Sequence, residues 1–384
     1  MPSITFLYPA VYLYIMKSEL TSLDMHYLAR EFQALIGAKV DKIYEQSEDK
    51  KEFLFVFHKP SAGKLMLRIH LPNLAYLTDY KQTFPDTPPG FCMFLRKHLG
   101  NSKIKEVRQK GFDRILEIVF DTKEGIRFLI CELFSKGNMV LVDEDYKIKG
   151  LLESQNWEAR TIRGGAKYEY PPEQLNSTSI SSEQFRKAIS ESKMDSIVKS
   201  LAVELGLGGL YAEELCKRAG VDKDKKQVSE NKFEALFSEL YSLFNEQIKA
   251  NKINDEIVPF YLSVDATGRI DYPGFSNALD ENLTAKSMMI AENKQAKEKQ
   301  TKQGKIKVVI EKQEARLKES EQSIVDNQRK GELIYEHYQE VKELLGSINF
   351  DRKKMSWEEL KKKYANHKLI KGIDENKGQI ILEL

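Results

Sequence analysis

The segment that begins near residue 282 is rich in Lys, Glu and Gln, and no proline occurs between it and the C-terminus. One apolar stripe in this segment repeats every seven residues and consists of Ile310, Leu317, Ile324, Tyr338 and Leu345. The companion stripe carries Gln313, Ser320 and Asn327 in its middle. Because only one stripe is consistently apolar, the pattern predicts a long exposed helix or an antiparallel pair, not a strong parallel dimer. At about 1.5 Å per residue, such an arm spans on the order of 60 Å.

The rest of the chain has the composition of a globular protein. With 384 residues it is too long for one compact core, so two or three units are expected. The 60 Lys and Arg residues nearly balance 58 Asp and Glu, so nucleic-acid binding requires local clusters of charge. Cys92, Cys131 and Cys216 form no CxxC pair, which suits a reducing, cytoplasmic compartment. No metal-ligand spacing and no cofactor fingerprint occur, so we expect neither a metal nor a cofactor.

Residues 1–15 are apolar but do not have the pattern of a signal peptide. They contain no Lys or Arg, have Pro9 in the middle, and are too short to span a bilayer. Met16, followed by KSELTSLD, is a better candidate for the natural first residue, so we interpret residues 1–15 as an upstream extension. No other apolar run reaches membrane length, and we therefore expect a soluble protein without membrane partners.

Periodicity predicts an α+β fold with an antiparallel sheet. We expect helices at 19–36 and 91–99, strands at 38–46, 52–59 and 64–72, and a meander of short strands over 104–145. Residues 183–250 read as helices joined by a glycine hairpin at 205–214. Residues 258–273 predict a β-hairpin turning at Thr267 and Gly268, and 368–384 predict two short strands around a turn.

The densest basic cluster lies in 96–114. It consists of Arg96, Lys97, His98, Lys103, Lys105, Arg108, Lys110 and Arg114, and is opposed by Glu106 and Asp113. The cluster is able to follow a phosphate backbone, although a charge run alone favours a solvated face. Asp113 and Arg114 are adjacent at the start of a strand and therefore point to opposite faces. One of them must pair or face a ligand; a salt bridge beside the turn is the alternative.

Further candidate sites are less specific. Asp24, in the first turn of the first helix, is explained by capping or by the helix dipole. The loop 135–138, the segment RTIRGG and the glycine hairpin LGLGGLYAEE each offer donors for phosphate, but ordinary turns explain them as well. The candidate phosphate contacts are Lys136, Asn138, Arg160, Arg163, Gly206, Gly208 and Gly209. Met1-Pro2 is followed by Ser3 where a glycosylase needs glutamate, so glycosylase chemistry is rejected.

Many segments, in order along the chain, resemble the NFACT proteins, a family that includes NEMF, fibronectin-binding protein A, Caliban and Tae, and especially its archaeal members. They include SLDMHYLAREF, PPGFCMFLRKHL, KGFDRILEIVF, CELFSKGNMVLVD, NWEARTIRGGAKYEYPP, LGLGGLYAEELCKRAGVDK and KLIKGIDENKGQIILEL. The resemblance covers nearly all of 16–384.

The resemblance implies a domain order. It comprises a glycosylase-like but non-catalytic N-terminal domain (16–173), a helix-hairpin-helix domain (174–257), a hairpin linker returning to the first domain (258–281), a coiled-coil arm (282–328) and a small α+β tip domain (329–384). In the family a returning helix and the C-terminal RNA-binding NFACT-R domain follow, so we expect a truncated chain or a split gene.

The resemblance also implies a function in ribosome-associated quality control. Such a protein binds the large ribosomal subunit with its peptidyl-tRNA and stalled nascent chain. It recruits tRNA, chiefly alanyl-tRNA in prokaryotes, for untemplated C-terminal tailing. The family's tRNA-engaging positions fall on Asp24, Asp113 and Arg114, while Ser135 stands where glycine is more usual. The protein is then no enzyme and has no DNA partner. The alternatives are a fibronectin-binding surface adhesin and a DNA-repair-like nucleic-acid-binding protein.

Overall fold

The computed structural model describes residues 17–384 except 47–50, 158–159, 173–174, 266 and 376, and describes only the backbone of 285–300 and 302. The proposed N-terminal extension, 1–15, lies outside the described residues. The chain forms two compact units, 1–291 and 292–384. The finer domain boundaries expected from the sequence stay predictions.

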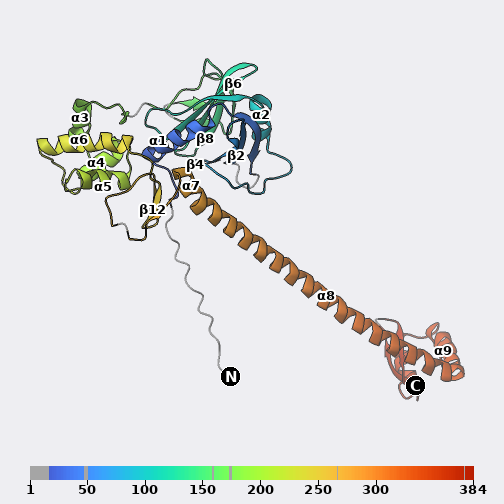
Figure 1. Cartoon of the computed structure of the whole chain (residues 1–384). Coiled ribbons are helices and arrows are strands. Elements are labelled where there is room, and N and C mark those ends of the chain that lie inside the picture. Colours follow the sequence, from blue (N-terminus) through green and yellow to red (C-terminus); the bar gives the residue numbers. More distant parts are fainter. Residues whose placement is uncertain (1–16, 47–50, 158–159, 173–174, 266, 376) are drawn as a thin grey trace. The chain divides into compact units, whose positions relative to one another are not determined.

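A nine-stranded antiparallel sheet forms the centre of the first unit (Figure 1). Its order is β4-β3-β2-β1-β5-β6-β7-β8-β9, so nearly every strand pairs with its neighbour in sequence. The strands are β1 Lys39–Glu45, β2 Glu52–Lys59, β3 Gly63–His70, β4 Leu74–Leu77, β5 Lys103–Gln109, β6 Ile115–Thr122, β7 Gly125–Glu132, β8 Asn138–Val142 and β9 Ile148–Leu151. The predicted meander is confirmed. A second small ladder pairs β10 Gln155–Asn156 with β11 Thr161–Ile162.

Side-chain alternation explains how the sheet is covered. In β2, Phe53, Phe55 and Phe57 point into the main core, while Leu54 and Val56 pack in a separate cluster on the other face. The segment after β4 lies against this second face through Phe84.

Two helices pack on the sheet, as the periodicity predicted. Helix α1, Ser22–Glu31, begins with a capping box in which Thr21 and Asp24 bond each other's backbone N–H groups, and it continues as a 3-10 turn, Phe32–Leu35. Helix α2, Gly90–Leu99, buries Cys92, Leu95 and Leu99.

Four helices form the second half of this unit: α3 Ser182–Glu191, α4 Ile197–Glu204, α5 Gly209–Arg218 and α6 Glu230–Asn245. Their buried residues, including Leu201 and Leu240, join the same hydrophobic core as those of α1 and the sheet. Tyr27 of α1 donates a hydrogen bond to Leu243 O of α6, and His26 contacts Phe244 O at 3.0 Å. The helices and the sheet are therefore held as one body by apolar packing and by these bonds.

The predicted hairpin at 258–273 is wrong. The structure instead pairs β12 Asn251–Ile253 with β13 Glu256–Val258 through a tight turn at Asn254 and Asp255, both at positive φ. Strand β14, Ile270–Asp271, joins the other edge of β12. The local turn signal at Gly268 is real, since its φ is +78°. However, the strand after this turn, β14, pairs with β12 and not with the segment directly before the turn, as the sequence had predicted. Helix α7, Phe275–Leu279, and a π-helical turn, Asp280–Thr284, follow.

The long helix expected near the C-terminus is confirmed as α8, Ala285–Glu336. Leu317 of the seven-residue stripe is 60% exposed and Ile324 is 64% exposed, so this stripe has no packing partner among the described residues. The second unit is completed by α9 Tyr338–Arg352, α10 Trp357–Tyr364, β15 Ile370–Asp374 and β16 Gln379–Leu382. The predicted pair of short terminal strands is confirmed. Across the part of the chain that the structure describes, none of the helices combines the length and apolarity needed to cross a bilayer.

Candidate nucleic-acid interface

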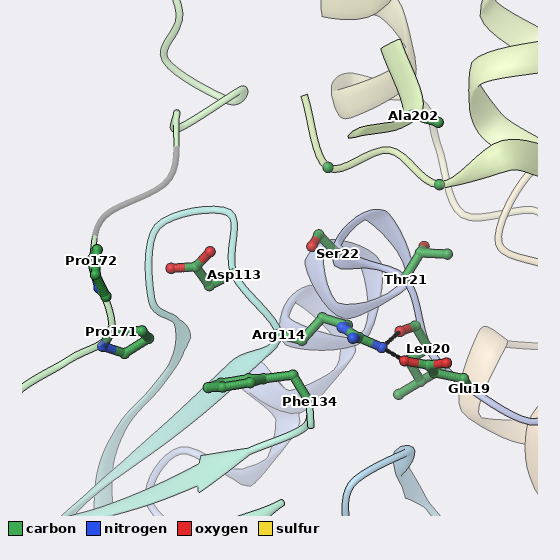
Figure 2. A pocket seen from close by; sticks show the side chains of 12 residues that line it. Glu19, Leu20, Thr21, Ser22, Asp113, Arg114, Phe134, Pro171, Pro172 and Ala202 are labelled. Atoms are coloured by element: carbon green, nitrogen blue, oxygen red, sulfur yellow. Dashed lines mark hydrogen bonds and ion pairs between the residues drawn. The ribbon is translucent and has the colours of Figure 1, made fainter. Parts of the chain in front are cut away.

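A cavity of about 470 Å³ opens in the first unit where three segments meet. The turn before β6 supplies Asp113 and Arg114, the start of α1 supplies Thr21 and Ser22, and the loop between α4 and α5 supplies glycines (Figure 2). Phe134 and the pair Pro171 and Pro172 complete the walls. We call this cavity the Asp-Arg cleft. It brings together segments that are up to 190 residues apart in the chain, roughly the separation between α1 and the glycine loop.

The Asp113–Arg114 pair projects from both sides of a tight turn. Gly111 adopts φ +55° and Asp113 N donates to Lys110 O at 3.1 Å, which sets the turn. Asp113 lies on the side of the two prolines, and Arg114 extends toward the start of α1 (Figure 2). The two side chains therefore extend in different directions, but both precede β6, which begins at Ile115, and both line one cleft, so the predicted placement on opposite faces of a strand is wrong.

Arg114 is held at the cleft without being buried in it. Its guanidinium forms an ion pair with Glu19 and donates to Leu20 O at 3.3 Å, and the side chain stays 26% exposed. Partial desolvation lowers the pKa of Arg114, but a guanidinium remains charged at neutral pH. Glu19 is itself 53% exposed, so a phosphate or a base can replace this surface partner at low cost.

Gln109 connects two of the three walls. Its side-chain amide donates 2.9 Å hydrogen bonds both to Ser22 O at the start of α1 and to Asp113 O in the turn. This residue was missed by the sequence reasoning. Its only signal was a polar amide at the end of an otherwise alternating strand, and that signal is weak.

The glycine loop between α4 and α5 forms the third wall, and its backbone lies close to the start of α1. Gly206 and Gly208 have φ of +65° and +74°, a region that favours glycine. A methyl group on Gly208 would lie 3.0 Å from Thr21 Cγ2, so the Thr21 side chain would have to shift to admit it. Both residues line the cleft, whereas Gly209 lines a different cavity near Lys199. Of the three predicted glycines, two are therefore at this site.

Asp24 lies behind the cleft wall and is completely buried. Its carboxylate accepts from Lys17 Nζ at 2.6 Å, Tyr211 Oη at 2.6 Å and Thr21 N at 2.7 Å. Burial, followed by the charge of Asp24, raises the pKa of Tyr211, which stays a neutral donor. This geometry makes the carboxylate a link between α1 and α5, and its buried position does not favour the expected direct contact with tRNA, which stays a prediction.

Two of the other predicted phosphate contacts are internal. Asn138 is fully buried, donating to Glu153 O at 2.8 Å, and Arg160 pairs with Glu132 at 2.6 Å. The prediction of RNA contact by Asn138 and Arg160 is therefore not supported by the geometry, because their polar groups are used inside the fold. Lys136 and Arg163 are exposed, and Lys136 Nζ lies 5.8 Å from the Trp157 ring, but neither lines the cleft.

The basic cluster of 96–114 does not form one surface at the cleft. Arg108 is paired with Glu106 at 2.9 Å and with Glu117 at 2.5 Å. Arg96 and Lys97 lie on α2, and Arg96 lines a different pocket. The folding of the chain has thus separated charges that are neighbours in sequence.

An antiparallel sheet joined to a helical segment is a fold seen in other proteins. The solved N-terminal part of the fibronectin/fibrinogen-binding protein of Streptococcus suis aligns with a TM-score of 0.58 and 24% identity, covering 70% of this chain and all of that one. The first unit therefore shares the fold of the N-terminal region of fibronectin-binding-like proteins.

The chain belongs to the NFACT family, because residues 21–380 match the NFACT N-terminal and middle domains. The archaeal Rqc2 homolog aRqcH of Methanocaldococcus jannaschii is 33% identical over 96% of this chain, which spans 58% of that relative's length. Ribosome quality control complex subunit 2 of Saccharomyces cerevisiae is 38% identical over 37% of this chain and 14% of its own length.

Proposed function

We propose that this protein is a ribosome-associated quality control factor of the cytoplasm. It binds the large ribosomal subunit that still holds a peptidyl-tRNA and a stalled nascent chain. It recruits a further tRNA without the direction of a template, for tailing of the nascent chain, and alanyl-tRNA is the expected species. The names of its relatives, as Rqc2 homologs and quality control complex subunits, support the assignment.

The observation that carries the proposal is the placement of Asp113 and Arg114 at one open cleft. A carboxylate accepts hydrogen bonds from the amino groups of bases, and a guanidinium stacks on bases or binds phosphate. Sequence-specific RNA recognition uses unpaired bases, which fit between such walls. The cleft therefore suits the loop of a tRNA.

The glycine loop offers a phosphate contact beside this pair. We take α4, the loop and α5 as a helix-hairpin-helix element, in which backbone N–H groups at the start of the second helix bind phosphate. Gly208 caps α5 and lines the cleft together with Gly206. Phosphate contacts position the tRNA, while the Asp-Arg pair selects it.

In this proposal the protein is not an enzyme. Peptide-bond formation belongs to the ribosome, and the protein contributes positioning. Asp24 acts from behind the wall, where it holds Thr21 and Tyr211 in place.

The test is the double variant Asp113→Ala/Arg114→Ala, purified with its bound ribosomal particles. We expect the large subunit to be retained and the copurifying tRNA species to lose their selectivity, as measured by RNA sequencing. The matched control is Asp224→Ala/Lys225→Ala, an adjacent acid–base pair on an exposed loop. An unchanged set of tRNAs in the first variant overturns the assignment of the pair. A protein found on the cell surface instead of with ribosomes favours adhesion.

A further inference from the structure

A second cavity of about 600 Å³ lies on the first unit and shares no lining residue with the Asp-Arg cleft. It is enclosed by β1, by the segment 81–88 that follows β4, and by α2. We call it the β1–α2 pocket. Nothing in the proposed use of the Asp-Arg cleft requires it.

Two aromatic rings form its apolar wall. Tyr44 and Phe84 stack with centroids 5.0 Å apart and planes 26° from parallel. Both pack against the second face of the sheet, on a cluster made by Leu54, Val56 and Met66. Gln46 Nε2 donates to Thr83 O at 2.9 Å and fastens the segment to the end of β1. The rings are therefore fixed by packing before any ligand arrives.

Cations gather beside these rings. Lys81 Nζ lies 4.3 Å from the Tyr44 centroid and donates to its hydroxyl at 3.0 Å. The Arg96 guanidinium lies 5.5 Å from the same centroid, with Nε bound to Ile43 O at 2.7 Å. Among the described residues, none accepts from the terminal nitrogens of Arg96 or from Lys42, which also lines the pocket. The Arg96 guanidinium is therefore held in place with its terminal nitrogens available, and the Lys42 ammonium is available at the surface.

Two carboxylates complete the lining, Asp41 and Asp86, both exposed. A simple anion makes no use of the carboxylates or the rings, and a metal ion is repelled by three cations. A nucleotide matches every group: phosphate for Arg96 and the lysines, a planar base for the aromatic wall, and base amino groups for the carboxylates.

We propose that the β1–α2 pocket binds a nucleotide, presented by a single-stranded stretch of RNA. Lys42 and Lys81 are exposed at its rim, where they reach the phosphates of neighbouring nucleotides. A free nucleotide offers the same chemistry without those neighbours. The pocket is a second nucleic-acid contact that operates independently of the Asp-Arg cleft.

The test measures the affinity of the 384-residue chain for two probes, a fluorescein-labelled adenylate hexamer RNA and adenosine 5′-monophosphate. Lys42→Glu/Lys81→Glu reverses the charge at the rim, and Phe84→Leu removes a stacking ring but keeps apolar packing. Lys226→Glu, at an exposed lysine outside both cavities, is the matched control for charge reversal. Thermal unfolding checks that each variant is folded.

We expect hexamer affinity to fall about tenfold in Lys42→Glu/Lys81→Glu and roughly fivefold or more in Phe84→Leu, and to be unchanged in Lys226→Glu. Each pocket variant should lower hexamer affinity by the same factor in the Asp113→Ala/Arg114→Ala background as in the wild type, which separates this inference from the proposed function. Monophosphate binding as tight as hexamer binding, with the same response to the variants, assigns the pocket to a free nucleotide. Hexamer binding that both pocket variants leave within twofold of the wild type overturns the inference.

Discussion

Asp24 and Asp113 are both carboxylates associated with one cleft, but their surroundings give them different tasks. Asp113 is partly exposed in a turn, whereas Asp24 is fully buried and accepts bonds from three residues. A buried carboxylate that is hydrogen-bonded to its neighbours stabilises the fold around it, whereas a partly exposed carboxylate is accessible to a ligand. Within the proposed function, recognition therefore falls to Asp113 and positioning to Asp24.

The two roles predict different responses to substitution. Asp24→Asn leaves the buried Lys17 ammonium without its counter-charge, so we expect a loss on the order of 3 to 5 kcal/mol in the free energy of unfolding. Tyr211→Phe removes only one donor to Asp24, with a loss of roughly 1 to 2 kcal/mol. Urea unfolding measures both, and both variants should weaken tRNA capture because the wall between α1 and α5 is loosened.

Tyr211→Phe decides between positioning and direct contact. Tyr211 is fully buried and does not line the cleft, so its hydroxyl affects the site through its bond to Asp24 and not by touching the RNA. If tRNA capture is normal in Tyr211→Phe but absent in a folded Asp24→Asn protein, Asp24 contacts the tRNA itself and the positioning role is wrong.

At the scale of elements, the sequence predicted correctly those features that depend on residues close together in the chain. The capping box of Thr21 and Asp24, the alternation in β2 and the glycine turns all depend on residues within a few positions of one another. Pairing between strands is different, because it depends on which edge is available. That is why the turn at Gly268 was found while the partner of its strand was not.

The glycine loop gives a paired prediction. Gly208→Ala places a methyl group 3.0 Å from Thr21 Cγ2 at φ +74°, so we expect a cost of about 1 to 3 kcal/mol and a distorted cleft. Gly209→Ala, one residue later in the first turn of α5, has open space and should stabilise the protein by about 0.5 to 1 kcal/mol. Thermal unfolding compares the two, and equal effects would show that the loop conformation is not what requires glycine at 208.

At the scale of the whole molecule, the two compact units have separate cores. The second unit is built around Leu344, Ile348, Leu360 and Tyr364, and this cluster includes no residue of the first unit. Each core should therefore respond to its own mutations.

Leu360→Ala tests this separation. The side chain is fully buried, so we expect the second unit to lose about 2 to 5 kcal/mol while the first keeps its stability. Hydrogen exchange followed by mass spectrometry should show lost protection in α9 and α10 but not in β2 and β3. Leu317→Ala is the control, since that leucine is 60% exposed on α8 and its loss should cost less than about 0.5 kcal/mol. Equal loss of protection in both units contradicts separate cores.

The sequence by itself determined the element types, the long exposed helix and the adjacent Asp113–Arg114 pair, because period and turn chemistry act over short distances. Only the tertiary structure decided which of the candidate residues share a site. Asn138 and Arg160 form hydrogen bonds and an ion pair inside the fold. Arg96 lines another pocket, and the Asp24 carboxylate is bonded to Lys17 and Tyr211. These outcomes depend on how distant segments pack and bury polar groups, and burial is a property of the assembled fold.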